Sequence, residues 1–153
     1  MQRKFVISDL EKCTGCQVCE YVCSAVKEKG FNPTISRIRT LRTEPSFNMA
    51  SACRLCDDAP CVVACPTKAL SKDEETGVIK VNEDKCKGCS WCIEKCEYGA
   101  IALHPVKGTV VICDLCGGDP KCISYCPREA LHLATSEDAP HSKMKIANKR
   151  MVM

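Results

Sequence analysis

Cysteine is the residue type in this sequence whose number and spacing point most directly to chemistry. Sixteen cysteines stand among 153 residues, a far larger share than an ordinary globular chain carries. Thiolates at this density bind metal ions or clusters, or the thiols pair as disulfides. They form four groups of four with none left over: Cys13, Cys16, Cys19 and Cys23; Cys53, Cys56, Cys61 and Cys65; Cys86, Cys89, Cys92 and Cys96; Cys113, Cys116, Cys122 and Cys126.

The spacing inside each group favours iron–sulfur clusters. Groups one and three follow C-x2-C-x2-C-x3-C, while groups two and four lengthen the middle gap and add a proline after the fourth cysteine. Three thiolates at short intervals on a tight loop reach three corners of one cube, and the fourth ligates the neighbouring cluster. We expect this fourth cysteine to begin a helical turn. Gly15 and Gly88 stand where the loops need tight turns.

Disulfides and zinc are the alternative uses of these cysteines. Disulfides need an oxidising compartment, yet residues 1–10 contain no apolar run of signal-peptide length. Structural zinc sites use two C-x2-C pairs separated by a long spacer, whereas each group here is compact. We therefore expect four [4Fe–4S] clusters in a cytoplasmic protein. No membrane span is expected, because no stretch approaches the roughly 20 apolar residues that one requires.

Composition and charge agree with this expectation. Apolar residues make up 45% of the chain, but without the cysteines the share falls to about 35%, a thin core for this length. The formal charge of +3 counts every thiol as neutral. Four oxidised clusters with their thiolates would bring it to about −5. The lysines and arginines then balance cluster charge, and no nucleic-acid surface is predicted.

The segments around the groups predict an α+β fold of small β-hairpins and short helices. Such hairpins with two cluster loops make a bacterial-ferredoxin-like unit, and four groups make two such units, each with two clusters, which are intertwined if groups one and four pair. Alternating apolar residues and turn residues predict the strands. The strands are expected at residues 4–7, 69–70, 77–81, 100–103, 109–112 and 130–133.

Spacing alone leaves open which groups pair. Groups two and three flank a single hairpin, and the first and last strands have no other evident partners. Pairing those two strands would bring groups one and four together around the two–three unit. A tandem arrangement, one with two and three with four, is also compatible with the spacing.

The stretch 13–127 resembles the four-cluster iron–sulfur subunits of the DMSO-reductase and formate-dehydrogenase type. The motifs that carry the resemblance are CTGCQVCEYVC, CRLCDDAPCVVACP, CKGCSWCIEKC and CDLCGGDPKCISYCP. The resemblance implies a wire of four clusters in which group one pairs with four and two with three. It implies a first outer set (Cys13, Cys16, Cys19, Cys126), a second outer set (Cys23, Cys113, Cys116, Cys122), a first inner set (Cys53, Cys56, Cys61, Cys96) and a second inner set (Cys65, Cys86, Cys89, Cys92).

These sets define the expected domain organisation. A four-cluster domain covers residues 1–134, with an inner unit over about 50–100 and an outer unit from 1–30 and 105–134. The tail, residues 135–153, either docks a partner or is disordered. Residues 35–42 are expected to form a basic extended segment. Arg54 either donates to a cluster sulfur or forms a surface pair.

The predicted function is electron transfer without a catalytic site of its own. The sequence has no dinucleotide fingerprint, phosphate loop or nucleophile–base pair. The compact size is similar to the small subunits of tungsten-containing aldehyde oxidoreductases, or to the ferredoxin-like partner of CO dehydrogenase. The expected partners are a larger tungsto- or molybdopterin aldehyde or formate oxidoreductase, or CO dehydrogenase, and a soluble carrier such as ferredoxin. The alternative is a free-standing polyferredoxin without a dedicated catalytic subunit.

Overall fold

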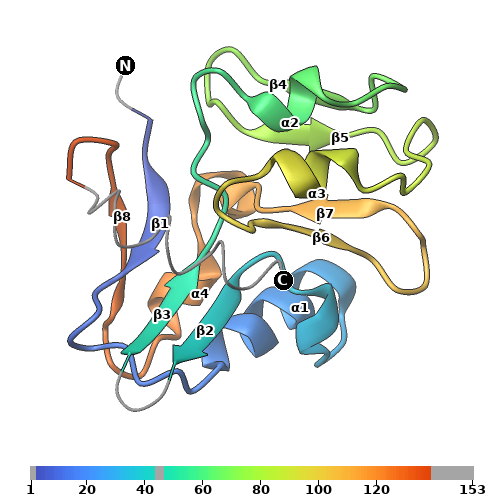
Figure 1. Ribbon diagram of the computed structural model, residues 1–153. Coiled ribbons are helices and arrows are strands. Elements are labelled where there is room, and N and C mark those ends of the chain that lie inside the picture. The colour runs from blue at the N-terminus through green and yellow to red at the C-terminus, as the bar shows by residue number, and fades with distance from the viewer. Residues whose placement is uncertain (1–2, 44–46, 139–153) are drawn as a thin grey trace.

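The computed structural model describes residues 3–43 and 47–138 (Figure 1). It has the expected α+β character, with small antiparallel sheets and short helices. No helix within these two ranges is long and apolar enough to cross a membrane. The strands are β1 (Phe5–Ser8), β2 (Arg39–Thr43), β3 (Phe47–Ser51), β4 (Leu70–Lys72), β5 (Ile79–Val81), β6 (Ile101–Leu103), β7 (Val110–Ile112) and β8 (Leu131–Ala134).

Three expected strand pairings are confirmed. The first and last strands, β1 and β8, are antiparallel, with Phe5 opposite Ala134 and Ser8 opposite Leu131. The pairs β4–β5 and β6–β7 form the two expected hairpins. The larger sheet has the order β2-β3-β1-β8. The two ends of the described chain therefore lie side by side in one sheet.

The segment between groups one and two differs from expectation. Residues 35–42 do not form one extended run, because a 3-10 turn (Pro33–Ile35) precedes β2. Strand β3 was not expected, since the Asn, Ala and Ser of its sequence FNMAS have low strand propensity. It forms because β2 and β1 pair with its two edges. Met49 of β3 is fully buried (0% exposed) and anchors the strand in the core.

The helices begin before the third cysteine of each group, not at the fourth. Cys19, Cys61, Cys92 and Cys122 all lie within helices, and in groups two to four the helix ends before the fourth cysteine. A turn does begin at the fourth cysteine of groups two to four, as expected, because its carbonyl accepts from the amide three residues further on (Lys68, Gly99 and Glu129). The loop closes in a left-handed residue in groups one to three, and the chain enters the helix directly after it. The helices are α1 (Val18–Glu28), α2 (Pro60–Val63), α3 (Trp91–Lys95) and α4 (Lys121–Ser124).

The helices pack in two pairs, α1 with α4 and α2 with α3. In Figure 1, α2, α3 and the hairpins β4–β5 and β6–β7 occupy the upper part, while α1, α4 and the larger sheet lie below and to the left. Two groups of buried residues form the core, and each contains cysteines: Cys53, Cys61 and Cys92 in one, Cys19, Cys23 and Cys122 in the other. These six cysteines thus belong to the buried core.

Candidate metal centres

All sixteen cysteines are free thiols. Three hollows in the structure are each lined by four cysteines, and these are the first outer, second outer and first inner sets. For the second inner set, Cys65 and Cys86 lie near enough to Cys92 for their negative charge to raise its pKa. Cys89 is exposed. Each set takes three cysteines from one group and its fourth from another. Among the described residues, no three His, Cys, Asp or Glu side chains lie close enough to share a single metal ion.

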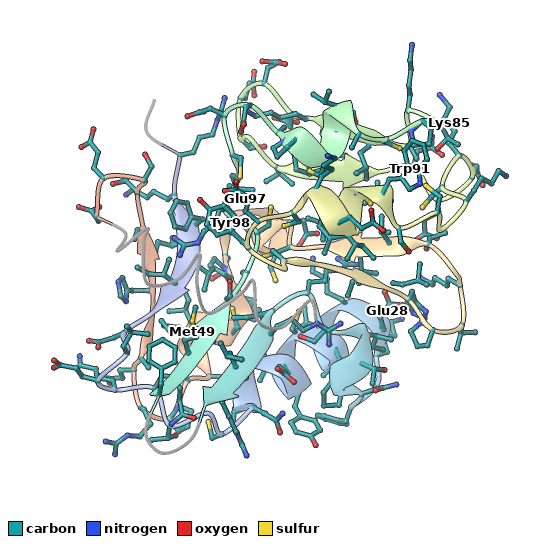
Figure 2. The ribbon with its side chains drawn as sticks, viewed as in Figure 1. Glu28, Met49, Lys85, Trp91, Glu97 and Tyr98 are labelled. Atoms are coloured by element: carbon teal, nitrogen blue, oxygen red, sulfur yellow. The ribbon has the colours of Figure 1, made fainter. Side chains whose placement is uncertain are left out.

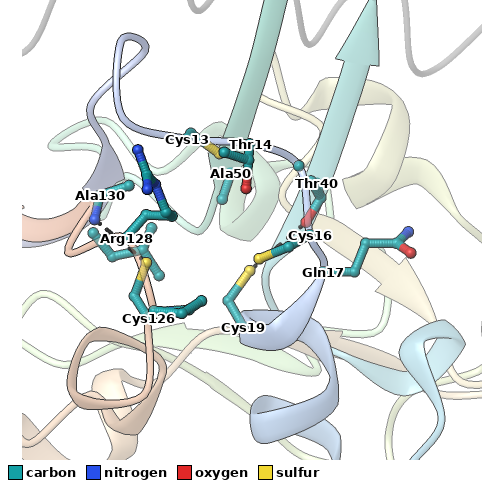
Figure 3. Close-up of a pocket in the computed structure, with 13 residues that line it drawn as sticks. Cys13, Thr14, Cys16, Gln17, Cys19, Thr40, Ala50, Cys126, Arg128 and Ala130 are labelled. Atoms are coloured by element: carbon teal, nitrogen blue, oxygen red, sulfur yellow. Dashed lines mark hydrogen bonds between the residues drawn. The ribbon is translucent and has the colours of Figure 1, made fainter.

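The first outer set lies between the loop before α1, strand β2 and the turn after α4 (Figure 3). Burial raises the pKa of Cys19 to about 12, although a contact with the hydroxyl of Thr40 (Sγ to Oγ1, 3.7 Å) lowers it. The Sγ of Cys126 accepts a hydrogen bond from the amide of Ala130 at 3.3 Å. Buried thiols of this kind are neutral unless a bound metal takes the place of the proton.

The second outer set shares its hollow with a group of charged side chains. Burial raises the pKa of Cys113 to about 12, and Cys23 lies near enough to add to the rise. The amide of Arg37 donates to Cys23 Sγ at 3.3 Å. The ammonium of Lys27 lies 2.7 Å from Asp114, and the Arg37 guanidinium lies 3.6 Å from the same carboxylate. Charges are therefore paired beside this set.

The first inner set lines a cavity of about 770 Å³. Burial raises the pKa of Cys61 to about 11, and that of Cys53 rises further for the same reason. The amide of Ala100 donates to Cys96 Sγ at 3.4 Å. Arg54, which follows Cys53, also lines this cavity and is only 6% exposed. The surface pair considered for Arg54 from the sequence is therefore wrong.

In the second inner set, Cys65 differs from the other thiols. Its slight burial raises the pKa, but bonds from the Thr67 hydroxyl and the Ala69 amide outweigh this and lower it. The Ala69 amide lies 3.2 Å from the sulfur. For Cys92, burial raises the pKa to about 11. Cys65 therefore loses its proton more readily than Cys92 does.

Hydrogen bonding to the fourth cysteine follows a regular pattern. In groups two to four the donor is the amide four residues further on, from Ala69, Ala100 or Ala130. In group one the donor is Arg37, from the segment between groups. Such N–H groups stabilise thiolates and tune the clusters that thiolates hold. An all-cysteine donor set with amides directed at sulfur fits a [4Fe–4S] cluster.

Some residues beside the sulfurs carried no signal in the sequence. Thr40 and Arg37 come from the long segment between groups one and two, and only folding brings them to Cys19 and Cys23.

His104, the most buried histidine among the described residues, caps a turn: its Nδ1 accepts from the amides of Val106 (3.2 Å) and Lys107 (3.1 Å). The imidazole thus stabilises the turn between β6 and β7.

Comparison with known proteins gives consistent matches. A family model described as a 4Fe-4S dicluster domain matches residues 46–136. The polyferredoxin-like subunit of an aliphatic sulfonate oxidoreductase from Pyrococcus furiosus is 43% identical, across 91% of this chain and 82% of the relative. Protein NrfC of Escherichia coli is 34% identical, across 91% and 68%. The beta subunit of an NADH-dependent phenylglyoxylate dehydrogenase from Aromatoleum evansii is 39% identical, across 84% of this chain and 30% of the relative.

A solved structure shares the fold. A chain of the active-site complex BamBC of benzoyl coenzyme A reductase superposes with a TM-score of 0.51 at 22% identity, covering 99% of this chain and 90% of that one. The family model describes an iron–sulfur domain, and two of these relatives are named as subunits of oxidoreductases. Multiple [4Fe–4S] clusters are therefore the cofactors of such a chain.

Proposed function

We propose that this chain, which belongs to the 4Fe-4S dicluster domain family of iron–sulfur electron-transfer subunits, holds four [4Fe–4S] clusters as a wire. One observation carries the proposal. Each hollow is lined by three cysteines of one group and the fourth cysteine of another group. Exchange of fourth ligands is the way two-cluster ferredoxins hold neighbouring clusters close together.

The proposed ligands are the two outer sets and the two inner sets. The packing of α1 on α4 and of α2 on α3 supports two intertwined units, one outer and one inner. The pairing of β1 with β8 supports an outer unit that encloses the inner one. We assign both units to one domain, residues 1–134. Residues 139–153 of the tail, for which partner docking was one expectation, lie outside the described residues.

A [4Fe–4S] cluster supplies one-electron transfer with little rearrangement, and the chain supplies the surroundings. Its cysteines fix the positions, its amides donate to the sulfurs, and burial of Cys19 and Cys53 keeps water away. No substrate chemistry is assigned to the chain itself. We place it in the cytoplasm, because cluster ligands must not pair with one another, no disulfide joins the sixteen cysteines, and a reducing compartment keeps cysteines unpaired.

The proposed partners are a larger catalytic oxidoreductase and a soluble carrier such as ferredoxin. A tungsto- or molybdopterin enzyme for aldehydes or formate, or CO dehydrogenase, follows from the sequence resemblance. The relative from Pyrococcus furiosus, named as a subunit of an aliphatic sulfonate oxidoreductase, adds a sulfonate-oxidising enzyme as a second candidate. A free-standing polyferredoxin is the alternative. Co-purification of a large catalytic subunit from the native source would argue against it.

The test is the content of iron, acid-labile sulfide and zinc per chain in protein purified without oxygen. Four [4Fe–4S] clusters predict about sixteen iron and sixteen sulfide. About four zinc without sulfide would contradict the proposal and leave a structural zinc protein. About eight iron would leave a two-cluster protein, in which half of the cysteine groups do not bind a cluster.

A further inference from the structure

The position after the first cysteine of each group differs in charge among the four groups. It holds Thr14 in group one, Arg54 in group two, Lys87 in group three and Asp114 in group four. The longer middle gaps of groups two and four carry further charges, Asp57, Asp58, Asp119 and Lys121. None of these four side chains is buried, so water screens them.

Of these four residues, only Arg54 is a buried cation. Its side chain is 6% exposed, and its guanidinium carbon lies 4.6 Å from the centroid of the Phe5 ring and 5.3 Å from that of Tyr98. Tyr98 is labelled in Figure 2. Two aromatic faces hold a desolvated guanidinium in a fixed place. Burial lowers the pKa of Arg54, yet an arginine stays protonated because its ordinary value lies above about 12.

Arg54 faces the cavity that the first inner set lines, together with Phe5 and Tyr98. The other charged residues of this cavity are Arg3, Lys95, Asp57, Asp58 and Glu97. Four of these five are exposed, Arg3 is partly buried, and Arg3 pairs with Asp57. Water and salt screen charges at such a rim, whereas a buried charge is screened much less. Arg54 is therefore the charge that a cluster in this set experiences most strongly.

No other lysine or arginine of the described residues is as deeply buried as Arg54. Beside the second outer set, Lys27, Arg37 and Lys121 are only partly buried. Lys87, beside the second inner set, is exposed. Arg128, which lines the hollow of the first outer set, is also exposed. Water therefore screens the cations at these three places more than it screens Arg54.

We propose that Arg54 makes the cluster held by the first inner set the most readily reduced of the four, so that an electron entering the chain rests there. The inference rests on the proposed four-cluster function. Uptake of one electron makes the cluster with its four thiolates one unit more negative. A fixed neighbouring cation favours the more negative state, so it raises the reduction potential. Arg54 is proposed to act on the cluster through its positive charge, and no bond between the two is proposed.

The experiment compares R54M with the wild-type protein, using EPR spectra recorded at a series of controlled potentials. We expect R54M to shift one of the four midpoint potentials to a more negative value and to leave the other three in place. R54K keeps the charge, so its potentials should lie close to those of the wild-type protein. K87M is the matched control, because it removes a cation from the equivalent but exposed position. It should leave all four potentials near their wild-type values.

Two outcomes would overturn the inference: unchanged potentials in R54M, or a shift in K87M as large as that in R54M. Iron and sulfide are counted first in every variant. Fewer than four clusters in the wild-type protein would reject the proposed function, whereas four clusters with unmoved potentials in R54M reject only the role of Arg54. If R54M does not load four clusters, Y98L provides the second test. It keeps the cation but removes one ring, and should shift the same single potential in the same direction.

Discussion

At the residue scale, the fourth cysteine of each group decides how the loops combine. Cys23 lines the same hollow as Cys116, although more than ninety residues separate them in the sequence. Cys56 belongs to a different hollow. Because a cluster can be lost only once, two substitutions at ligands of the same cluster should together remove no more iron than one of them does.

Iron counts in double variants test this pairing. We expect about twelve iron per chain in C23A and also in C23A/C116A, but about eight in C23A/C56A. The measurement is iron and sulfide per chain after anaerobic reconstitution. A tandem arrangement of groups predicts the reverse, with about eight iron in C23A/C116A and about twelve in C23A/C56A. Either pattern identifies the partner of Cys23.

Gly88 provides a second prediction at this scale, because its loop passes close to the backbone of another turn. Its φ is +62°, and an added Cβ would lie 2.3 Å from the carbonyl oxygen of Gly108. We expect G88A to lower the free energy of unfolding by about 2 kcal/mol or more, since it adds a clash to left-handed strain. G30A is the control, because its nearest neighbour would be 3.9 Å away. Equal melting temperatures for the two variants would contradict this.

The cysteines were predictable as a ligand inventory but not as sets. Their spacing indicated clusters because three thiolates on one tight loop suit one cube. Spacing carries no information on which distant loop supplies the fourth thiol, because that depends on strand pairing. Likewise, Arg54 could be placed beside a ligand from the sequence, but only folding stacks it between Phe5 and Tyr98.

At the element scale, Asp73 organises the turn of the hairpin β4–β5. Its carboxylate accepts from the amide and hydroxyl of Thr76 (both 2.9 Å) and lies 2.6 Å from the ammonium of Lys80. The hydrogen bond with Lys80 is the largest of the causes that hold the pKa of Asp73 well below its usual range. A carboxyl whose pKa is lower in the folded chain than in the unfolded chain stabilises the fold at pH values above the unfolded-chain pKa. This contribution is lost as the pH falls through the folded-chain pKa.

We therefore expect D73A to lower the melting temperature by a few degrees, with a gap from the wild type that stays constant between about pH 5 and 8. Thermal unfolding followed by circular dichroism measures the gap. E74A, at an exposed position of the same turn, is the control and should melt like the wild type. A gap that appears only toward the alkaline end would contradict the assignment to Asp73.

The hairpins could be predicted because turn residues separate their strands. Strand β3 could not, because its residues gain strand conformation only from the two neighbours that pair with it. The start of each helix could not be predicted for a related reason. The point where each helix begins depends on a left-handed loop residue, Gln17, Ala59 or Ser90 in groups one to three, and none of these is a glycine whose identity would have marked it.

At the scale of the whole molecule, Glu28 joins α1 to the turn between β6 and β7 (Figure 2). Its carboxylate lies 3.1 Å from Lys107 and 3.5 Å from Arg37, and the side chain is 15% exposed. An acidic residue at a helix C-terminus is unfavourable by itself, so these cations explain its presence. E28Q should lower the free energy of unfolding by about 1–3 kcal/mol in denaturant titrations. K107M, whose side chain is 40% exposed, should cost less, and the opposite order would contradict the link.

Removal of iron is the prediction that involves the entire chain. Both groups of core residues include cysteines, and the cysteines line hollows that the surrounding apolar side chains do not fill. Without clusters these thiols lose their common partner, and the remaining core is small for a chain of this length. Binding energy at such centres is therefore also folding energy.

We expect the chain to lose its cooperative thermal transition when a chelator and an oxidant strip the iron, and to regain it when iron and sulfide are restored. Near-ultraviolet circular dichroism and amide hydrogen exchange follow the change, and protection should be lost first in the short helices, which lie against the cysteines. The strand pair β1–β8 is held by backbone hydrogen bonds over four residue pairs, so it should keep protection longest. If the iron-free chain melts at the holo-protein's temperature, the apolar residues suffice to hold the fold, and the clusters serve electron transfer alone.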